Sequence, residues 1–237
     1  MLNHENPLKL KYKFIYFLGV EGSGKTTYFS LLLRLFTRCK IKARYIAIRS
    51  NHLFTYILMN IVSSIVPSIK ERKQYYGDAL RAFMNTDLWR RLYYPLLFYL
   101  DLLSVLVLAL VKVLLPLHLG YVVVAENYVI DTLADIQRRL HLVGRKYALS
   151  VASKLLLRLI PMYSIVVYLY ADYNTLCRRY LMRGSQTEPY AYISVRAKQL
   201  LNLLKFASNA RIHIVDTRAN ILSVFRKILR SLFEQSR

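Results

Sequence analysis

Residues 19–27 decide the fold of this 237-residue chain, and they read Gly19-Val20-Glu21-Gly22-Ser23-Gly24-Lys25-Thr26-Thr27. They fit the phosphate-binding pattern G-x-x-x-x-G-K-[ST]. The continuously apolar run at 14–18 predicts a buried parallel strand before them, and the broad apolar face of 26–38 predicts a helix after them. A turn between strand and helix exposes backbone N–H groups to phosphate oxygens, and the helix dipole adds to the attraction.

The residue types in this stretch suit a nucleoside triphosphate. Lys25 would reach the β- and γ-phosphates, and the hydroxyl of Thr26 would bind Mg²⁺. Three of the seven glycines of the chain fall here, which disfavours the alternative of a glycine-rich turn without a ligand. The sequence therefore predicts that ATP phosphates contact Glu21, Gly22, Ser23, Gly24, Lys25, Thr26 and Thr27.

Length and composition predict one α/β domain over residues 1–237. Hydrophobic residues make up 55% of the chain, which excludes a disordered protein. Cys39 and Cys177 match no metal-ligand spacing, which fits a reducing compartment. The residues before the first predicted strand show no apolar core of the signal-peptide type. We expect a cytoplasmic protein, with membrane association left open.

The formal net charge of +22 favours contact with polyanions such as nucleotides, nucleic acid or an anionic membrane. Basic residues are dispersed along predicted helices and form no nucleic-acid-binding module, so no specific nucleic-acid binding is expected. A solvated basic surface explains the charge equally well.

Apolar runs alternate with helical patterns along the chain, which predicts a doubly wound parallel sheet. The expected strands are 14–18, 43–48, 121–125, 164–170 and 211–215. Together with residues 19–27 they predict a three-layer P-loop NTPase fold, with a five-stranded parallel sheet flanked by helices. Ligands of such sheets lie at the carboxyl ends of the strands, where the charged residues Glu21, Arg49, Glu126, Asp172 and Asp216 fall.

Residues 93–119 predict an unusually apolar helix. A membrane span needs about 20 apolar residues, but Asp101 and Lys112 interrupt this run, and Pro116 and Gly120 are expected to end it. The pattern favours a core or subunit-interface helix over a membrane-surface helix, and a membrane-surface helix over a span.

A magnesium–triphosphate site needs a carboxylate close to Lys25 and Thr26. Glu126, after the third strand, is the first candidate, and Asp172, after the fourth strand, is the second. The alternative for either residue is a helix cap or a surface carboxylate. We predict that Thr26 and Glu126 hold the metal.

Positive charge must also close over the transferring phosphoryl group, and Arg179 and Arg183 are spaced to face one side of a short helix. They open a segment at 179–190 that could act as a mobile lid. Guanidinium groups bind phosphate in a bidentate fork. An exposed basic helix is an equally good explanation of the pair.

The order of these motifs resembles thymidylate kinase and its relatives among the P-loop nucleoside monophosphate kinases. The phosphate loop of that family commonly reads G-x-D-G-x-G-K-[ST]-T, and here Glu21 replaces the aspartate. The Asp-Arg-Tyr motif of the family resembles Glu126-Asn127-Tyr128, and its R-x-x-x-R-G lid entry resembles residues 179–184. Its terminal strand and the Asp-containing loop after it resemble residues 214–218.

The resemblance implies transfer of the γ-phosphoryl group of ATP, with Mg²⁺, to a nucleoside monophosphate, dTMP to dTDP above all. It implies catalytic roles for Lys25, Glu126, Arg179 and Arg183. It also implies a homodimer formed through the apolar helices. The residues that it assigns to the acceptor are Glu21, Arg49, Arg90, Arg91 and Tyr128.

The chain departs from the family at three further positions. Asn127 stands in place of the motif arginine, and Asp135 and Ile136 replace the tyrosine and glutamine that help to hold thymine. Nucleoside kinases of the same fold carry Glu at the position of Glu126, so a nucleoside kinase remains an alternative. A membrane-associated P-loop protein that binds ATP without nucleotide kinase activity is another.

Overall fold

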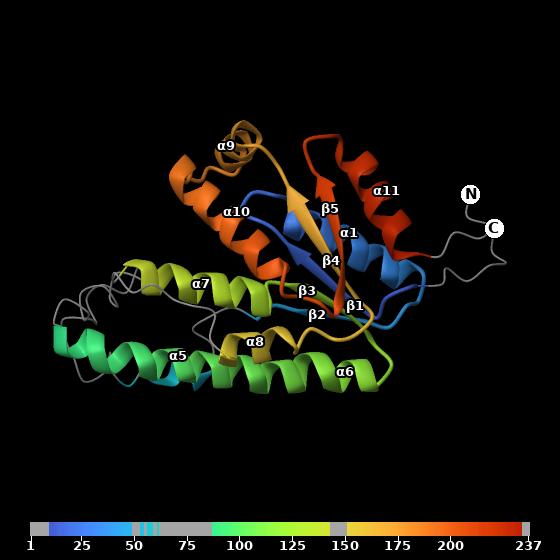
Figure 1. Ribbon diagram of the computed structural model, residues 1–237. Helices are drawn as coiled ribbons and strands as arrows, with labels where there is room; N and C mark the ends of the chain where they lie inside the picture. Colours follow the sequence, from blue (N-terminus) through green and yellow to red (C-terminus); the bar gives the residue numbers. More distant parts are fainter. Residues whose placement is uncertain are drawn as a thin grey trace.

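A five-stranded parallel sheet forms the centre of the protein in a computed structural model (Figure 1). The structure describes residues 10–48, 53–54, 56–58, 61, 87–142 and 151–233, with the backbone alone at 87–95, 97–98, 138–142 and 151–152. The strand order is β2-β3-β1-β4-β5. All five strands are parallel, so their carboxyl ends meet at one edge of the sheet. The strands are β1 (Phe14–Leu18), β2 (Ala43–Ile46), β3 (Val122–Glu126), β4 (Ser164–Tyr170) and β5 (Ala210–Asp216).

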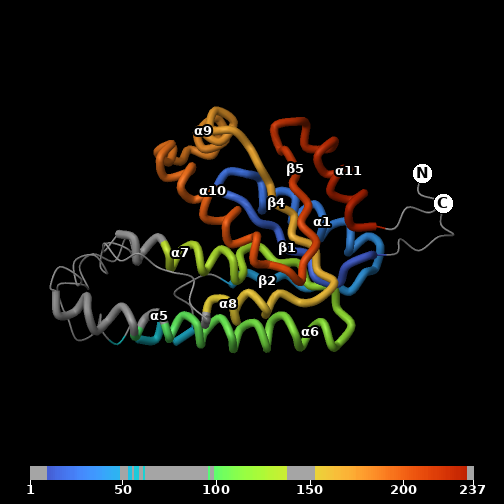
Figure 2. Tube along the Cα trace, viewed as in Figure 1, coloured from blue at the N-terminus to red at the C-terminus, as the bar shows by residue number. Residues whose placement is uncertain are grey.

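Helices cover both faces of the sheet, so the expected three-layer arrangement and five-stranded parallel sheet are confirmed (Figure 1). On one face lie α1 (Lys25–Arg38) and α11 (Ile221–Leu232). The other face carries α5 (Asp87–Ala109), α7 (Val129–Leu142), α8 (Val151–Leu157) and α10 (Tyr190–Leu204). At the carboxyl ends of the strands lies α9 (Tyr173–Met182), and the chain trace in Figure 2 shows the same layers.

The alternation of side chains along β1 explains why the run at 14–18 is apolar throughout. Phe14, Tyr16 and Leu18 join the core on the α5–α10 side, and Ile15 and Phe17 join the core beneath α1 and α11. All five are buried. A central strand covered on both faces has no position for a solvated polar side chain, so the period of two disappears from its sequence.

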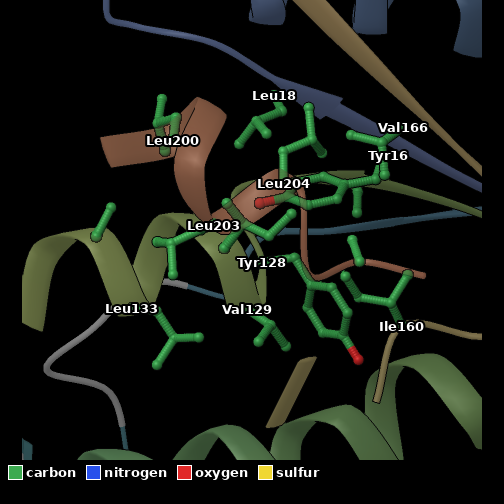
Figure 3. Close-up of a cluster of buried hydrophobic side chains, with 14 of the residues drawn as sticks. Tyr16, Leu18, Tyr128, Val129, Leu133, Ile160, Val166, Leu200, Leu203 and Leu204 are labelled. Carbon is green, nitrogen blue, oxygen red and sulfur yellow. The ribbon is translucent and has the colours of Figure 1, made fainter. Parts of the chain in front are cut away.

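The core on the α5–α10 side is built around Tyr16 and Tyr128, whose rings meet edge to face at 5.9 Å between centroids. Figure 3 shows these rings beside Leu133 of α7 and Leu203 and Leu204 of α10. Tyr128, two residues after β3, is thereby packed against α7 and α10. This packing holds the elements that follow the strand ends in fixed positions.

The expected apolar helix at 93–119 belongs to one continuous helical segment, called the rod below, which continues past Pro116. α5 passes into a π-helical turn, η1 (Leu110–Leu114), and then into α6 (Leu115–His118). Leu115 N donates to Leu110 O, the i to i+5 bond of a π-turn. Pro116 directly follows the π-turn, in the first turn of α6.

Part of this rod, Tyr99–His118, is the one helix of the described residues that is long and apolar enough to cross a membrane by length and composition. Of its most apolar window, 39% is buried inside the protein. The buried positions include Leu102, Val105, Ala109 and Val113, which belong to the main core. One face of the rod is therefore a core face, as the sequence pattern favoured.

Several element ends differ from the predicted ones. β2 stops at Ile46 instead of residue 48, and β3 extends through Glu126, which is a buried strand residue. α7 begins at Val129, so Asp131 lies in its first turn. Shifts of one or two residues are the usual extent to which the ends of elements vary.

Candidate active site

The loop at 19–24 connects β1 to α1 and depends on glycine at its two ends. Gly19 has φ 154°, and a Cβ there would lie 2.6 Å from the backbone oxygen of Leu169 on β4. Gly24 has φ 97° and precedes the first turn of α1, where a Cβ would lie 3.0 Å from the ring of Tyr28. Any other residue at these positions would move the loop, since backbone and core aromatic atoms cannot give way cheaply.

A cavity of about 350 Å³ lies beside this loop, at the carboxyl ends of β1 and β3. The structure brings together around it most of the residues predicted for phosphate and metal binding. It also adds residues of α7, α9 and α10 that the sequence motifs did not indicate. Lining residues are Gly19, Val20, Glu21, Gly22, Gly24, Lys25, Thr26, Glu126, Asn127, Asp131, Asp135, Tyr180, Arg183, Tyr192, Ile193 and Arg196.

Thr26 and Glu126 meet in the cavity although 100 residues separate them. Thr26 Oγ1 donates to Glu126 Oε1 at 2.6 Å. A hydroxyl and a carboxylate oxygen are hard ligands of the kind that Mg²⁺ prefers. Across the described ranges no group of three or more His, Cys, Asp and Glu residues could hold a metal on its own. The pair therefore fits a magnesium ion that takes its remaining ligands from substrate phosphates and water.

Lys25 lies across its own loop. Its Nζ donates to the carbonyl oxygens of Gly19 at 2.6 Å and Val20 at 3.1 Å. Burial lowers the pKa of the Lys25 ammonium, and the carboxylates of Asp131, Glu21 and Glu126 act in the opposite direction. The ammonium group thus donates to backbone oxygens at the rim of the cavity. A phosphate oxygen could replace these backbone oxygens as the acceptor.

The two lid arginines have different positions. Arg183 lines the cavity. Arg179 lies outside the lining, where Nη1 donates to Gly22 O and Thr217 Oγ1, both at 3.1 Å, and Nη2 donates to Thr217 O. Arg179 therefore joins the glycine loop to the segment after β5, and of these two arginines only Arg183 lines the cavity.

The two candidate carboxylates also separate. Asp172 is the N-cap of α9, since its Oδ1 accepts from Thr175 N at 2.7 Å, and this bond holds the pKa of Asp172 below its usual value. Glu126 instead bonds Thr26 at the cavity. Of the two, Glu126 lies beside Thr26 at the cavity, and Asp172 has the capping role that was its alternative.

A buried network that the sequence did not reveal extends from the cavity into the core. Asp131 accepts a hydrogen bond from the hydroxyl of Tyr16 at 2.5 Å, and Arg196 forms ion pairs with Asp131 at 3.9 Å and Asp135 at 2.8 Å. Burial raises the pKa of Asp131, and the charges of Lys25 and Arg196 oppose that rise. The spacing of Asp131 and Asp135 by four residues on α7 is the sequence signal that could have indicated a shared partner.

Nδ2 of Asn127 and the hydroxyl of Tyr180 are buried at the cavity and have no hydrogen-bond partner among the residues that the structure describes. Burial raises the pKa of Tyr180, so its hydroxyl keeps its proton. Asn127 has φ 64°, a left-handed conformation that asparagine tolerates better than most residues. Buried donors without partners are costly in a closed protein, which points to a ligand rich in acceptor oxygens.

The structure describes the side chains of only some of the residues predicted to bind the acceptor. Glu21 lines the cavity, but Tyr128 is fully buried in the core, where its hydroxyl donates to Leu159 O at 3.0 Å. The position of Tyr128 does not support an acceptor contact. Arg90 and Arg91 belong to the first turn of α5, where the side chains are not described, and Arg49 lies outside the described residues.

No protein-family model matches this chain, and comparison with curated proteins finds no match.

Proposed function

We propose that this protein is an ATP-dependent phosphotransferase that resembles thymidylate kinase and phosphorylates a nucleoside monophosphate. The observation that carries the proposal is the convergence of Lys25, Thr26 and Glu126 on one cavity beside the glycine loop. This is the constellation that holds the β- and γ-phosphates of a nucleoside triphosphate with magnesium. The proposal includes the P-loop identity of the fold.

Each side chain has a role that follows from its position. Backbone N–H groups of the loop and the start of α1 would bind the phosphates of ATP, and Lys25 would leave its own carbonyl partners for the β- and γ-oxygens. Thr26 and Glu126 would hold magnesium, which would neutralise charge between the phosphates when bound. Arg183 would stabilise the charge that spreads over the γ-phosphoryl oxygens during transfer.

The far side of the cavity would hold the acceptor. It is formed by Asp131, Asp135, Tyr192 and Arg196, together with Asn127 after β3. The unpartnered Asn127 amide and Tyr180 hydroxyl would donate to acceptor or phosphate oxygens once substrates are bound. Positioning of the two substrates and electrostatic stabilisation account for most of the catalysis in this class of reaction.

A specific observation favours a nucleoside as a second candidate acceptor. Among the described residues on the acceptor side, the cation is Arg196, and its charge is already matched by Asp131 and Asp135. An acceptor phosphate would need a further cation, and Arg49, Arg90 and Arg91 are the residues predicted to supply it. A neutral nucleoside needs none of them.

The test is a coupled assay of ADP release with Mg-ATP. The panel contains deoxy- and ribonucleoside monophosphates, the free nucleosides and a reaction without acceptor. Turnover with one monophosphate supports the proposal, and turnover with a nucleoside alone supports the second candidate. Silence across the panel would refute both.

Lys25→Ala should abolish turnover and leave the circular dichroism spectrum unchanged. The matched control is Lys227→Ala, an exposed lysine of α11 that does not line the cavity, which should leave turnover as it is. Equal turnover in both variants would refute the assignment of the phosphate loop.

A further inference from the structure

A stripe of large apolar side chains lies exposed along the outer face of α5, η1 and α6. Tyr99 is 64% exposed, Leu103 45% and Leu110 48%. From Leu96 to Leu110 the spacing alternates between three and four residues, which keeps these side chains on one face of the helix. The stripe consists of Leu96, Tyr99, Leu103, Leu106, Leu110, Val111, Leu115 and Leu119.

The π-helical turn keeps this stripe straight. In a regular α-helix, Leu115 would be rotated away from Leu110 by more than a quarter of a turn. In η1 the two residues are joined by the i to i+5 hydrogen bond, so one lies above the other along the helix axis. Leu119 follows Leu115 by four residues and extends the stripe to the end of the rod.

The rod lies along the surface of the protein and does not leave it. Its inner face carries Leu102, Val105, Ala109 and Val113 into the core between the sheet and α7. A crossing of a bilayer would expose these core residues and the buried Asp101 to lipid. Figures 1 and 2 show the rod lengthwise along the side of the molecule remote from α11.

Charge decides what could cover the stripe. Lys112 is exposed on η1 itself, and the adjacent α8 region adds the exposed Lys154 and Arg158. Of the carboxylates whose side chains the structure describes, only Asp101 belongs to these helices, and it is buried. The others belong to the glycine loop, the strand ends and the elements that adjoin them: Glu21, Glu126, Asp131, Asp135, Asp172, Glu188 and Asp216.

We propose that this face docks on an anionic lipid membrane, with the stripe inserted among the acyl chains at the interface and the lysines and arginine at the headgroups. Helices with one apolar face and flanking cations lie in the plane of the interface in this way. A second copy of the chain fits less well. Self-association through this face would bring Lys112, Lys154 and Arg158 of two strongly basic chains together, and the side chains described on these helices include no exposed carboxylate to match them.

The test is co-sedimentation of the full-length protein with vesicles. One set contains phosphatidylcholine alone, and the other contains about 30% phosphatidylglycerol, since anionic lipid attracts basic segments at the surface. The wild-type protein should bind the anionic vesicles, and rising salt should weaken binding because charge contributes to it. Lys112→Ala should lower the partition coefficient about fivefold.

The apolar contribution is isolated by two variants of equal charge. Leu110→Glu adds a negative charge in the stripe. Leu222→Glu adds the same charge on α11, at a side chain that is 63% exposed. Leu110→Glu should lower the partition coefficient at least tenfold, since burial of one leucine contributes roughly that factor or more. Leu222→Glu should change it only slightly. Circular dichroism verifies that both variants fold.

Three results would overturn the proposal. One is the absence of binding to anionic vesicles at low salt. Another is an equal loss of binding in the two leucine variants, which would mean that the net charge alone attracts the protein. The third comes from sedimentation equilibrium of the free protein. A dimer that Leu110→Glu splits into monomers, without binding of the wild type to vesicles, would make the stripe a subunit interface.

Discussion

The hydrogen bond from Tyr16 to Asp131 permits a prediction whose size follows from the geometry. Both residues are buried, the bond is 2.5 Å long, and it joins β1 to the first turn of α7. Tyr16→Phe removes the hydroxyl and keeps the ring in the core. Asp131 then retains a long contact from Tyr128 N at 3.4 Å and the ion pair with Arg196 at 3.9 Å.

We expect Tyr16→Phe to lower the free energy of unfolding by about 2 kcal/mol at neutral pH, because hydrogen bonds to charged groups contribute about 1.5 to 3 kcal/mol. The melting temperature should fall by roughly 4 to 8 °C in a chain of this length. The matched control is Tyr128→Phe. It is equally buried, but its hydroxyl donates to the neutral carbonyl of Leu159, so it should cost about 1 kcal/mol.

The effect should also depend on pH. Burial raises the pKa of Asp131, and the bond from Tyr16 is one of the contacts that limit this rise. A carboxyl whose pKa is higher in the folded state binds more protons there, so stability falls as pH rises from the unfolded to the folded pKa. Loss of the hydroxyl raises the folded pKa further, and the variant should lose more stability at neutral pH than near pH 4.

Urea unfolding of the wild type and both variants at the two pH values provides the measurement. Equal losses in Tyr16→Phe and Tyr128→Phe at neutral pH would refute the reasoning, since a neutral and a charged acceptor would then be equivalent. If Tyr16→Phe lost the same stability at both pH values, the bond from Tyr16 would not favour the charged form of Asp131 over the neutral form.

Three further predictions concern single contacts. Gly19→Ala should weaken ATP binding at least tenfold in calorimetry, because its Cβ would collide with the oxygen of Leu169 and displace the loop; unchanged affinity would contradict the close approach. Arg196→Met should lower the free energy of unfolding in urea by roughly 3 kcal/mol, since two carboxylates lose their partner, and a neutral effect would mean that water replaces the guanidinium. Arg218→Ala should raise the pKa of Asp216 from about 2 toward its usual value, as followed by NMR titration. The lowered pKa favours the fold above the unfolded carboxyl pKa, and this contribution is lost as pH falls toward 2.

Local patterns were sufficient to predict the sheet. The run at 14–18 is buried on both faces, and the five predicted strands pair in parallel with ends shifted by one or two residues. The meeting of Thr26 with Glu126 was predictable as well, because the carboxyl ends of parallel strands share one edge of the sheet.

Contacts between distant side chains were not predictable in the same way. Tyr16 and Asp131 are 115 residues apart, and no local pattern says that a tyrosine on the central strand will reach an aspartate on a helix. Arg179 and Arg183 share a helix face in the sequence, yet only Arg183 lines the cavity, since Thr217 and Gly22 hold Arg179. Such differences depend on how neighbouring segments fill space, which spacing along one helix does not contain.

The π-helical turn in the apolar rod has a consequence for length variation. A π-turn is equivalent to an α-helix with one residue inserted, because its hydrogen bonds span five residues instead of four. Deletion of a single residue within Leu110–Leu114 should therefore convert η1 into ordinary α-helix and leave α6 joined to β3. The same deletion a few residues earlier, in the part of α5 that carries Leu102 and Val105, would rotate the core face by about 100°. The π-turn at Leu110–Leu114 is thus a place where the chain could lose one residue and still fold.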